Sequence, residues 1–218
     1  MAVAPTPRWA ARVNTVCCHA WSKPLLFVLM LVPLAVLVAA AVLDQLGANP
    51  AQALVRSTGD WTLRSLCLVL AVTPLRVGLQ LSALARWRRM LGLFVYFYAT
   101  LHLLSYAWLD MGFELGDIAH DIPKRPFILV GFTAYMVLAA LALTSPNWMV
   151  RLLGGKNWRR LHQLVYLVAG LALLHFFWMR AGKNDFAEVW LYAAIIGLLL
   201  VWRLVRAVKT IRNRTLAL

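Results

Sequence analysis

Two histidines stand inside long apolar stretches of the chain, where an imidazole is costly to place. His102 lies within residues 90–109, and His175 lies within residues 161–179. Ionisable side chains inside a membrane are rare and usually mark a functional site. Two imidazoles at one depth could bind a single metal ion or a single haem iron between them, because neutral imidazole is a common ligand of both.

The two histidines are expected at the same depth, on helices that run in the same direction. His102 follows Met90 by 12 residues, and His175 follows Leu161 by 14 residues. At a rise of 1.5 Å per residue, both lie roughly 18–21 Å from the start of their helices. Two histidines so placed could be the axial ligands of one haem, an arrangement that favours electron transfer over oxygen binding. Hydrogen bonds to neighbouring helices and a zinc site remain as alternatives, although zinc usually takes four ligands.

His162 is a third candidate ligand, and Arg88 stands at the corresponding level of the other helix. His162 precedes His175 by 13 residues, and Arg88 precedes His102 by 14 residues. Arginine is a poor iron ligand, but its guanidinium suits a haem propionate or the phosphate of an anionic cofactor. The competing interpretations are an interfacial histidine for His162 and a simple topological anchor for Arg88.

The composition places these residues in a membrane protein. The 218 residues are 62% hydrophobic, with a mean hydropathy of +0.73. Six apolar stretches are long enough to cross a bilayer as helices: 24–43, 61–81, 90–109, 126–144, 161–179 and 188–205. The sequence therefore predicts an all-α integral membrane protein, a six-helix transmembrane bundle. Its expected parts are an N-terminal tail over 1–23, the bundle over 24–205 and a basic C-terminal tail over 206–218.

Charge is divided between the two sides of this six-helix path. The net charge is +14, yet all eight acidic residues fall on the side opposite the two termini. The side with the termini carries 16 of the 22 basic residues. By the positive-inside rule both termini are cytoplasmic. The basic charge thus indicates topology and contact with anionic lipid, and nucleic acid is not an expected partner. Residues 110–125, the longest predicted irregular segment, carry four of the acids and are the expected docking loop for a partner.

Short motifs between residues 44 and 180 show a family resemblance by their order and spacing. They are Thr58-Gly59-Asp60-Trp61, Thr73-Pro74-Leu75-Arg76, Arg88-Arg89-Met90-Leu91-Gly92-Leu93, Tyr98-Ala99-Thr100-Leu101-His102, Asp121-Ile122-Pro123-Lys124-Arg125-Pro126, Thr144-Ser145, Trp158-Arg159-Arg160-Leu161-His162 and His175-Phe176-Phe177-Trp178. The chain resembles the MsrQ (YedZ) family, the haem-binding membrane subunits of bacterial methionine sulfoxide reductase systems. That family lies within the ferric-reductase-like transmembrane family.

The resemblance implies a multi-pass protein of the bacterial inner membrane that binds haem b and transports electrons. His102 and His175 would be axial ligands and His162 a further one, for one haem or two; Arg88 replaces the histidine expected opposite His162. Electrons would pass to a periplasmic molybdenum-cofactor partner (MsrP), which would form a heterodimer with this chain and reduce methionine sulfoxide in oxidised proteins. The resemblance also implies FMN as a cofactor, and it implies the quinone pool or a flavin reductase as the electron donor.

Two other functions remain open from the residues. A small-molecule or ion transporter would use Pro74, Arg64 and Arg76 to mark a substrate path, since charged residues inside spans often do so. However, both arginines lie near span ends, where they can reach the interface. A stand-alone metal reductase would need a nicotinamide-binding domain, and none is recognisable in the sequence.

Overall fold

The computed structural model describes residues 7–182 and 184–215, and every regular element in these ranges is helical. Six helical runs are long and apolar enough to cross a membrane. They are Ser22–Val42, Pro50–Gly78, Arg88–Asp110, Pro126–Leu143, Gly155–Ala181 and Ala187–Asn213. The predicted all-α membrane protein with six transmembrane helices is thus confirmed.

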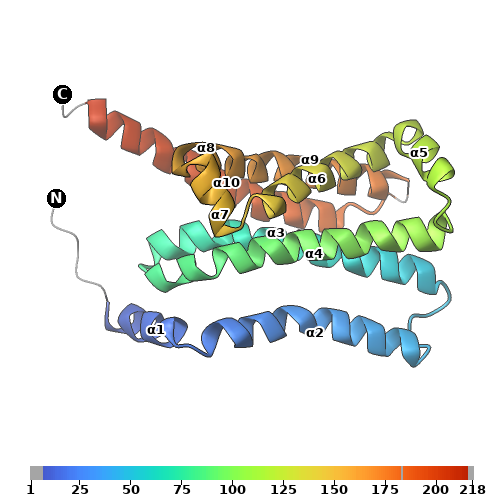
Figure 1. Ribbon diagram of the computed structural model, residues 1–218, viewed down its shortest axis with the longest axis horizontal. Coiled ribbons are helices and arrows are strands. Elements are labelled where there is room, and N and C mark those ends of the chain that lie inside the picture. The colour runs from blue at the N-terminus through green and yellow to red at the C-terminus, as the bar shows by residue number, and fades with distance from the viewer. Residues whose placement is uncertain (1–6, 183, 216–218) are drawn as a thin grey trace.

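Two helix pairs form the centre of the bundle (Figure 1). Helix α3 (Pro50–Gly78) packs along α4 (Arg88–Ser105), and α6 (Pro126–Leu143) packs along α9 (Val165–Ala181). Helix α10 (Ala187–Thr215) covers α3 and α9, because it contacts both. Helix α2 (Ser22–Val42) lies at the periphery beside α3.

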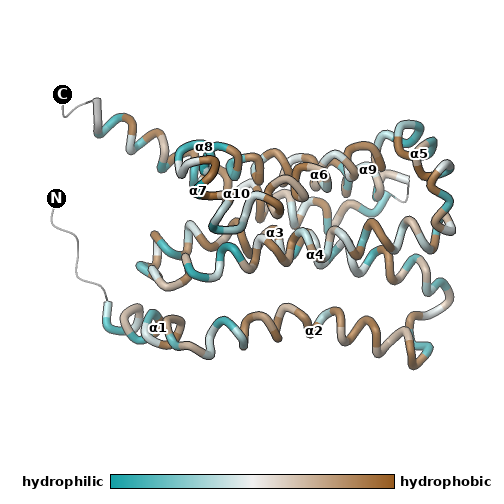
Figure 2. The backbone as a smooth tube through the Cα atoms, in the orientation of Figure 1, coloured by the Kyte–Doolittle hydropathy of each residue, from teal (hydrophilic) through white to brown (hydrophobic). Residues whose placement is uncertain are grey.

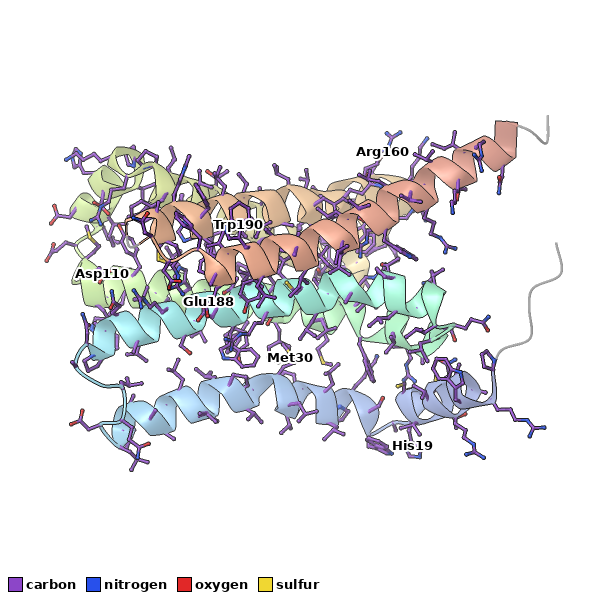
Figure 3. The ribbon with its side chains drawn as sticks, turned by 180° about the vertical axis from the view of Figure 1, so that it is seen from behind. His19, Met30, Asp110, Arg160, Glu188 and Trp190 are labelled. Carbon is purple, nitrogen blue, oxygen red and sulfur yellow. The ribbon has the colours of Figure 1, made fainter. Side chains whose placement is uncertain are left out.

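The bundle has two distinct ends, which we name by their charge. The basic end holds α1 (Arg8–Cys18), the C-terminal part of α10, α7 (Asn147–Leu153) and α8 (Gly155–Leu161). The acidic end holds α5 (Leu115–Lys124) and the connections between α2 and α3 and between α9 and α10. Figure 3 shows Asp110 and Glu188 toward the acidic end and Arg160 toward the basic end. Apolar residues fill the middle of the helices between these ends (Figure 2).

The buried core joins the two central helix pairs. Leu66, Val95, Val168 and Ile196 each have only 1% of their surface exposed and belong to one cluster contributed by α3, α4, α9 and α10. A second cluster attaches α2, where Met30 packs against Phe94 and Tyr98 of α4. The Tyr98 hydroxyl donates a hydrogen bond to the Met30 carbonyl oxygen at 2.6 Å. These contacts hold the cavity-lining helices in a fixed register.

The second spanning helix starts earlier than predicted. We expected it over 61–81, but α3 covers Pro50–Gly78. The Asn49 side chain accepts a hydrogen bond from the Gln52 backbone N–H, and Pro50 occupies the first turn, so both helix-start preferences are met. The first turns of α3 contain polar residues that line a cavity and do not face lipid. A prediction based on the length of apolar stretches therefore misses the start of this helix.

Three segments predicted as irregular or as tails contain helix. The predicted docking loop 110–125 contains α5, which follows a π-helical turn, η2 (Tyr106–Asp110). Helix α1 lies inside the predicted N-terminal tail, and α10 continues through the first part of the predicted C-terminal tail. Apolar content predicts which helices cross a bilayer, but it does not reveal amphipathic or polar helices that lie outside the bilayer core.

Candidate cofactor-binding cavity

His102 of α4 and His175 of α9 face each other inside the bundle, in the half nearer the acidic end. Their ring centroids are 6.1 Å apart, and the ring planes are inclined by 77°. Both line a cavity of about 500 Å³ between α3, α4, α6 and α9. The structure thus brings together the two histidines that the sequence singled out, although 73 residues separate them along the chain.

Each imidazole is held by a backbone carbonyl of the neighbouring helix. Nδ1 of His102 lies 2.9 Å from the Val55 carbonyl oxygen, and Nδ1 of His175 lies 2.6 Å from the Phe127 carbonyl oxygen. A carbonyl oxygen only accepts, so each Nδ1 carries the proton and each Nε2 keeps a free lone pair. Among the described residues neither Nε2 has a hydrogen-bond partner. This is the tautomer that a metal-binding histidine needs.

A glycine makes room for each imidazole. A Cβ at Gly131 of α6 would lie 2.7 Å from Nδ1 of His175, and a Cβ at Gly59 of α3 would lie 3.1 Å from Cε1 of His102. Each glycine follows by four residues the carbonyl that binds the same histidine. The two halves of the bundle therefore present their histidines by the same device, a glycine one helical turn after the accepting carbonyl.

The spacing of the two rings fits one metal ion between them. A bond from a metal to an imidazole nitrogen is about 2.0–2.1 Å, so two rings bound to opposite sides of one ion have centroids roughly 6 Å apart. In residues 7–182 and 184–215, no group of three or more His, Cys, Asp or Glu side chains could complete a bare metal site. A planar macrocycle supplies its own equatorial ligands and needs only axial ones. The donor set therefore fits a haem iron better than zinc.

The part of the cavity nearest the acidic end is lined by charged side chains. Arg56 and Asp60 come from α3, Asp110 from the end of η2, Arg125 from the α5–α6 junction and Arg180 from α9. Such a lining contrasts with the apolar residues around the imidazoles. A ligand that fits this cavity is therefore apolar in the middle of the bundle and acidic or polar at one edge.

Ion pairs fix two of these arginines. The Arg180 guanidinium donates to Asp185 at 2.8 Å and to Glu188, and it also lies over the Phe176 ring. Arg125 binds Asp121 at 2.6 Å.

A tyrosine hydroxyl completes the surroundings of the Asp121 carboxylate. The Tyr106 hydroxyl donates to Asp121 at 2.6 Å. This hydrogen bond, with the nearby Arg125 guanidinium, lowers the pKa of Asp121 below its ordinary value. The network attaches α5 to the turn that follows the His102 helix.

His162 lies at the basic end, away from the two facing histidines. Its ring stacks on Trp158 with centroids 4.0 Å apart, and its Nε2 lies 3.3 Å from the Thr144 hydroxyl. The Thr144 carbonyl oxygen also accepts a hydrogen bond from the Trp158 indole N–H. Thr144, Trp158 and His162 thus form one polar and aromatic group, and the structure does not bring His162 near another histidine of the described chain.

Arg88 also lies outside the cavity. Its guanidinium donates a hydrogen bond to the Thr73 hydroxyl at 2.6 Å, and its electrostatic neighbours include Arg76 and Arg203. Arg203 lies over the Tyr166 ring and donates to the Leu70 carbonyl oxygen. All eight acidic residues of the chain stand elsewhere in the sequence, on the connections at the acidic end or near it. This arginine cluster is therefore an electropositive feature of the basic end.

Sequence reasoning did not identify several parts of the cavity. Gly59 lies inside the Thr58-Gly59-Asp60-Trp61 motif, which assigns it no role, and Gly131 lies outside all of the motifs. The presence of each glycine within a membrane-spanning helix is a usable signal. A glycine destabilises a helix, so it is expected where a neighbouring group approaches the backbone closely. The charged lining from Arg56 and Arg180 had no comparable signal, since an arginine near a span end is normally an anchor.

A membrane helical bundle with two facing histidines between parallel helices defines a class of membrane electron-transfer proteins. In agreement, the family model described as "Ferric reductase like transmembrane component" matches residues 58–173. The chain belongs to this family and, within it, to the MsrQ proteins, as its relatives show.

Three such relatives carry the name "Protein-methionine-sulfoxide reductase heme-binding subunit MsrQ". The protein of Polaromonas naphthalenivorans (strain CJ2) is 64% identical over 195 residues, which is 89% of each chain. That of Herminiimonas arsenicoxydans is 48% identical over 89% of this chain and 90% of the relative. That of Azospira oryzae is 42% identical over 96% of this chain and 85% of the relative.

Proposed function

We propose that this chain is the haem b-binding electron-transfer subunit of a methionine sulfoxide reductase system. The observation that carries the proposal is the pair of facing imidazoles, with centroids 6.1 Å apart and both Nδ1 atoms bound to backbone carbonyls. The names of the relatives support the same cofactor and the same system. Methionine sulfoxide itself would be reduced on the partner protein.

The chain's own groups do the positioning. The Val55 and Phe127 carbonyls fix the imidazole tautomers of His102 and His175, so that both lone pairs point away from the accepting helices. His102 and His175 would hold the haem, which would supply one-electron redox chemistry, and two protein ligands favour electron transfer over oxygen binding. The tightly packed core around the cavity keeps the ligand spacing constant, and a constant spacing limits reorganisation during electron transfer.

We propose that the basic end faces the cytoplasm and that the membrane is the bacterial inner membrane. The support is the charge asymmetry of the chain, because positively charged ends stay on the cytoplasmic side. Electrons would enter from the bilayer or at the basic end, with quinol or reduced flavin as donor. The arginine cluster around Arg88 suits an acidic group of such a donor, including the phosphate of FMN. His162, which lies at the same end, is the candidate ligand for a second haem.

The acidic end is the proposed exit toward a periplasmic molybdenum-cofactor partner resembling MsrP. The charged part of the cavity lies nearest this end, and the exposed acids Glu114 and Asp117 stand at the start of α5 there. Electrons leaving the pair His102–His175 would thus cross a short part of the bundle. The exposed acids of the segment 110–121 would steer a partner with a basic surface.

The proposal is tested by the spectrum of the purified full-length protein. Reduction with dithionite should give a b-type α-band, and a pyridine haemochrome assay should give one haem per chain, or two if His162 also binds one. His102→Ala and His175→Ala should each lose the haem of the facing pair. His120→Ala is the matched control, because His120 is an exposed histidine on α5 outside the cavity. Normal haem content in both cavity variants would overturn the proposal, and a haem-free wild type would favour a transporter.

A further inference from the structure

Three arginines line the cavity, and two of them are already paired with carboxylates. Arg125 binds Asp121, and Arg180 binds both Asp185 and Glu188. These pairs satisfy the charge of the two guanidinium groups within the protein. The carboxylates neutralise both guanidinium groups, so neither arginine is available as the counter-ion of an anionic ligand.

Arg56 is different, because its charge has no such partner. It is partly buried, lines the cavity from α3 and has no hydrogen bond or ion pair with any residue that the structure describes. Asp60, one helical turn further along α3, is an electrostatic neighbour but does not form an ion pair with it. A guanidinium removed from bulk water is costly without an anion or a set of hydrogen-bond acceptors. Arg56 is thus an unpaired cation at the cavity wall and is available to bind an anionic ligand.

The position of Arg56 relates it directly to the two imidazoles. Val55, its neighbour in sequence, provides the carbonyl that binds His102, and Gly59 on the next turn contacts the His102 ring. At 1.5 Å per residue, Arg56 lies about 4.5 Å from Gly59 along the helix axis, on the side of the acidic end. A flat ligand bound between the two histidines would therefore have one edge near Arg56.

We propose that Arg56 binds a carboxylate of the tetrapyrrole and so orients its acidic edge toward the acidic end of the bundle. The inference rests on the proposed function, since it assigns the counter-ion of the haem propionates. Arg56 would be a binding residue that selects an acid-bearing tetrapyrrole over a neutral one. A guanidinium suits this task because it can bind a carboxylate with two parallel hydrogen bonds.

The test compares haemin with haemin dimethyl ester, in which both carboxylates are neutral. Both would be titrated into haem-depleted full-length protein in detergent and followed by the Soret band. Wild type should prefer haemin, and Arg56→Gln should bind haemin roughly 10–100-fold more weakly, the range expected for a hydrogen bond to a charged group. Binding of the ester should be nearly unchanged. Arg56→Lys should recover part of the preference because it keeps the positive charge.

Arg64→Gln is the matched control for loss of a positive charge on the same helix. Arg64 lies two turns further along α3, donates to the Tyr192 hydroxyl at 3.2 Å and does not line the cavity. It should therefore bind haemin and the ester as wild type does. A second readout is the midpoint potential, which should fall in Arg56→Gln because removing a nearby cation favours the oxidised iron.

The possible failures are distinguishable. If wild type binds haemin and Arg56→Gln keeps the full preference over the ester, the inference about Arg56 is wrong while the proposed function stands. An equal affinity of wild type for haemin and its ester would also overturn it, and this comparison does not depend on any variant folding. If wild type binds neither compound, both the proposed function and the inference fail.

Discussion

Gly131 and His175 are in such close contact that a single methyl group at the glycine would displace the imidazole. The Cβ of an alanine there would lie 2.7 Å from Nδ1 and 2.9 Å from Cε1 of His175. The same ring is bound to the Phe127 carbonyl, one turn earlier on α6. The glycine and the carbonyl together define where the ring can lie, and a similar contact joins Gly59 and His102 at 3.1 Å.

Gly131→Ala should therefore weaken haem binding roughly 10–100-fold, the usual effect of disturbing a group that orients a metal ligand. Gly59→Ala should have a smaller effect, because its Cβ would need a shift of only a few tenths of an ångström. Gly170→Ala on α9 is the control, since a Cβ there meets no atom within 4 Å. Haem content and the reduced spectrum of the three variants show whether haem binding is weakened most in Gly131→Ala, less in Gly59→Ala and not in Gly170→Ala. Equal behaviour of Gly131→Ala and Gly170→Ala would contradict this account.

The number of spans and the pairing of His102 with His175 could be predicted from the sequence, because both depend on apolar length and on helical rise. The parts that could not be predicted depend on contacts between distant segments. The sequence around Val55 or Phe127 does not indicate that its backbone carbonyl accepts a hydrogen bond from a histidine about 47 residues away. The early start of α3 was missed because the polar residues of its first turns line a cavity.

His162→Ala should leave the haem of the facing pair intact, because His162 lies outside that cavity. The variant loses the stacking on Trp158 and the contact with Thr144, which together contribute about 1–3 kcal/mol to stability. Thermal unfolding and haem quantitation on the same sample separate the two effects. A fall from two haems per chain to one would assign the second haem to His162, and complete loss of haem would contradict the separation of the two sites.

Helix α5 should detach from η2 at acidic pH, because Asp121 holds the two together. Its pKa is lowered in the folded protein, so the stabilisation is complete above the ordinary aspartate pKa of about 3.9 and is lost as pH falls through the lowered value. Hydrogen-exchange protection factors of α5 should thus be constant near neutral pH and fall below about pH 4.

Two variants check this assignment to Asp121. Tyr106→Phe removes the hydroxyl that joins η2 to Asp121 and contributes most to the lowered pKa of Asp121. The protection of α5 should therefore already be weaker near neutral pH, and its further loss should begin at a higher pH. Asp121→Asn should reduce the protection at every pH and remove its acid dependence. Asp117→Asn, on the exposed part of the same helix, should behave as wild type. Unchanged protection of α5 in Asp121→Asn would show that other contacts hold the helix.

Charge reversal at the start of α5 should slow electron transfer to the proposed periplasmic partner, because the exposed acids there form the proposed docking surface. Glu114 and Asp117 are exposed and have no side-chain hydrogen bond or ion pair within the described chain, whereas Asp121 is committed to the Tyr106–Arg125 network. Reversal of Glu114 and Asp117 to lysine should reduce the association rate on the order of tenfold at low salt and less at high salt. Asp44→Lys, between α2 and α3 at the same end, is the control for one reversed charge. It is compared with Glu114→Lys and with Asp117→Lys, each of which changes the net charge by the same amount. Stopped-flow oxidation of the reduced protein by the partner measures both effects, and equal rates for all three single variants would place the docking surface elsewhere.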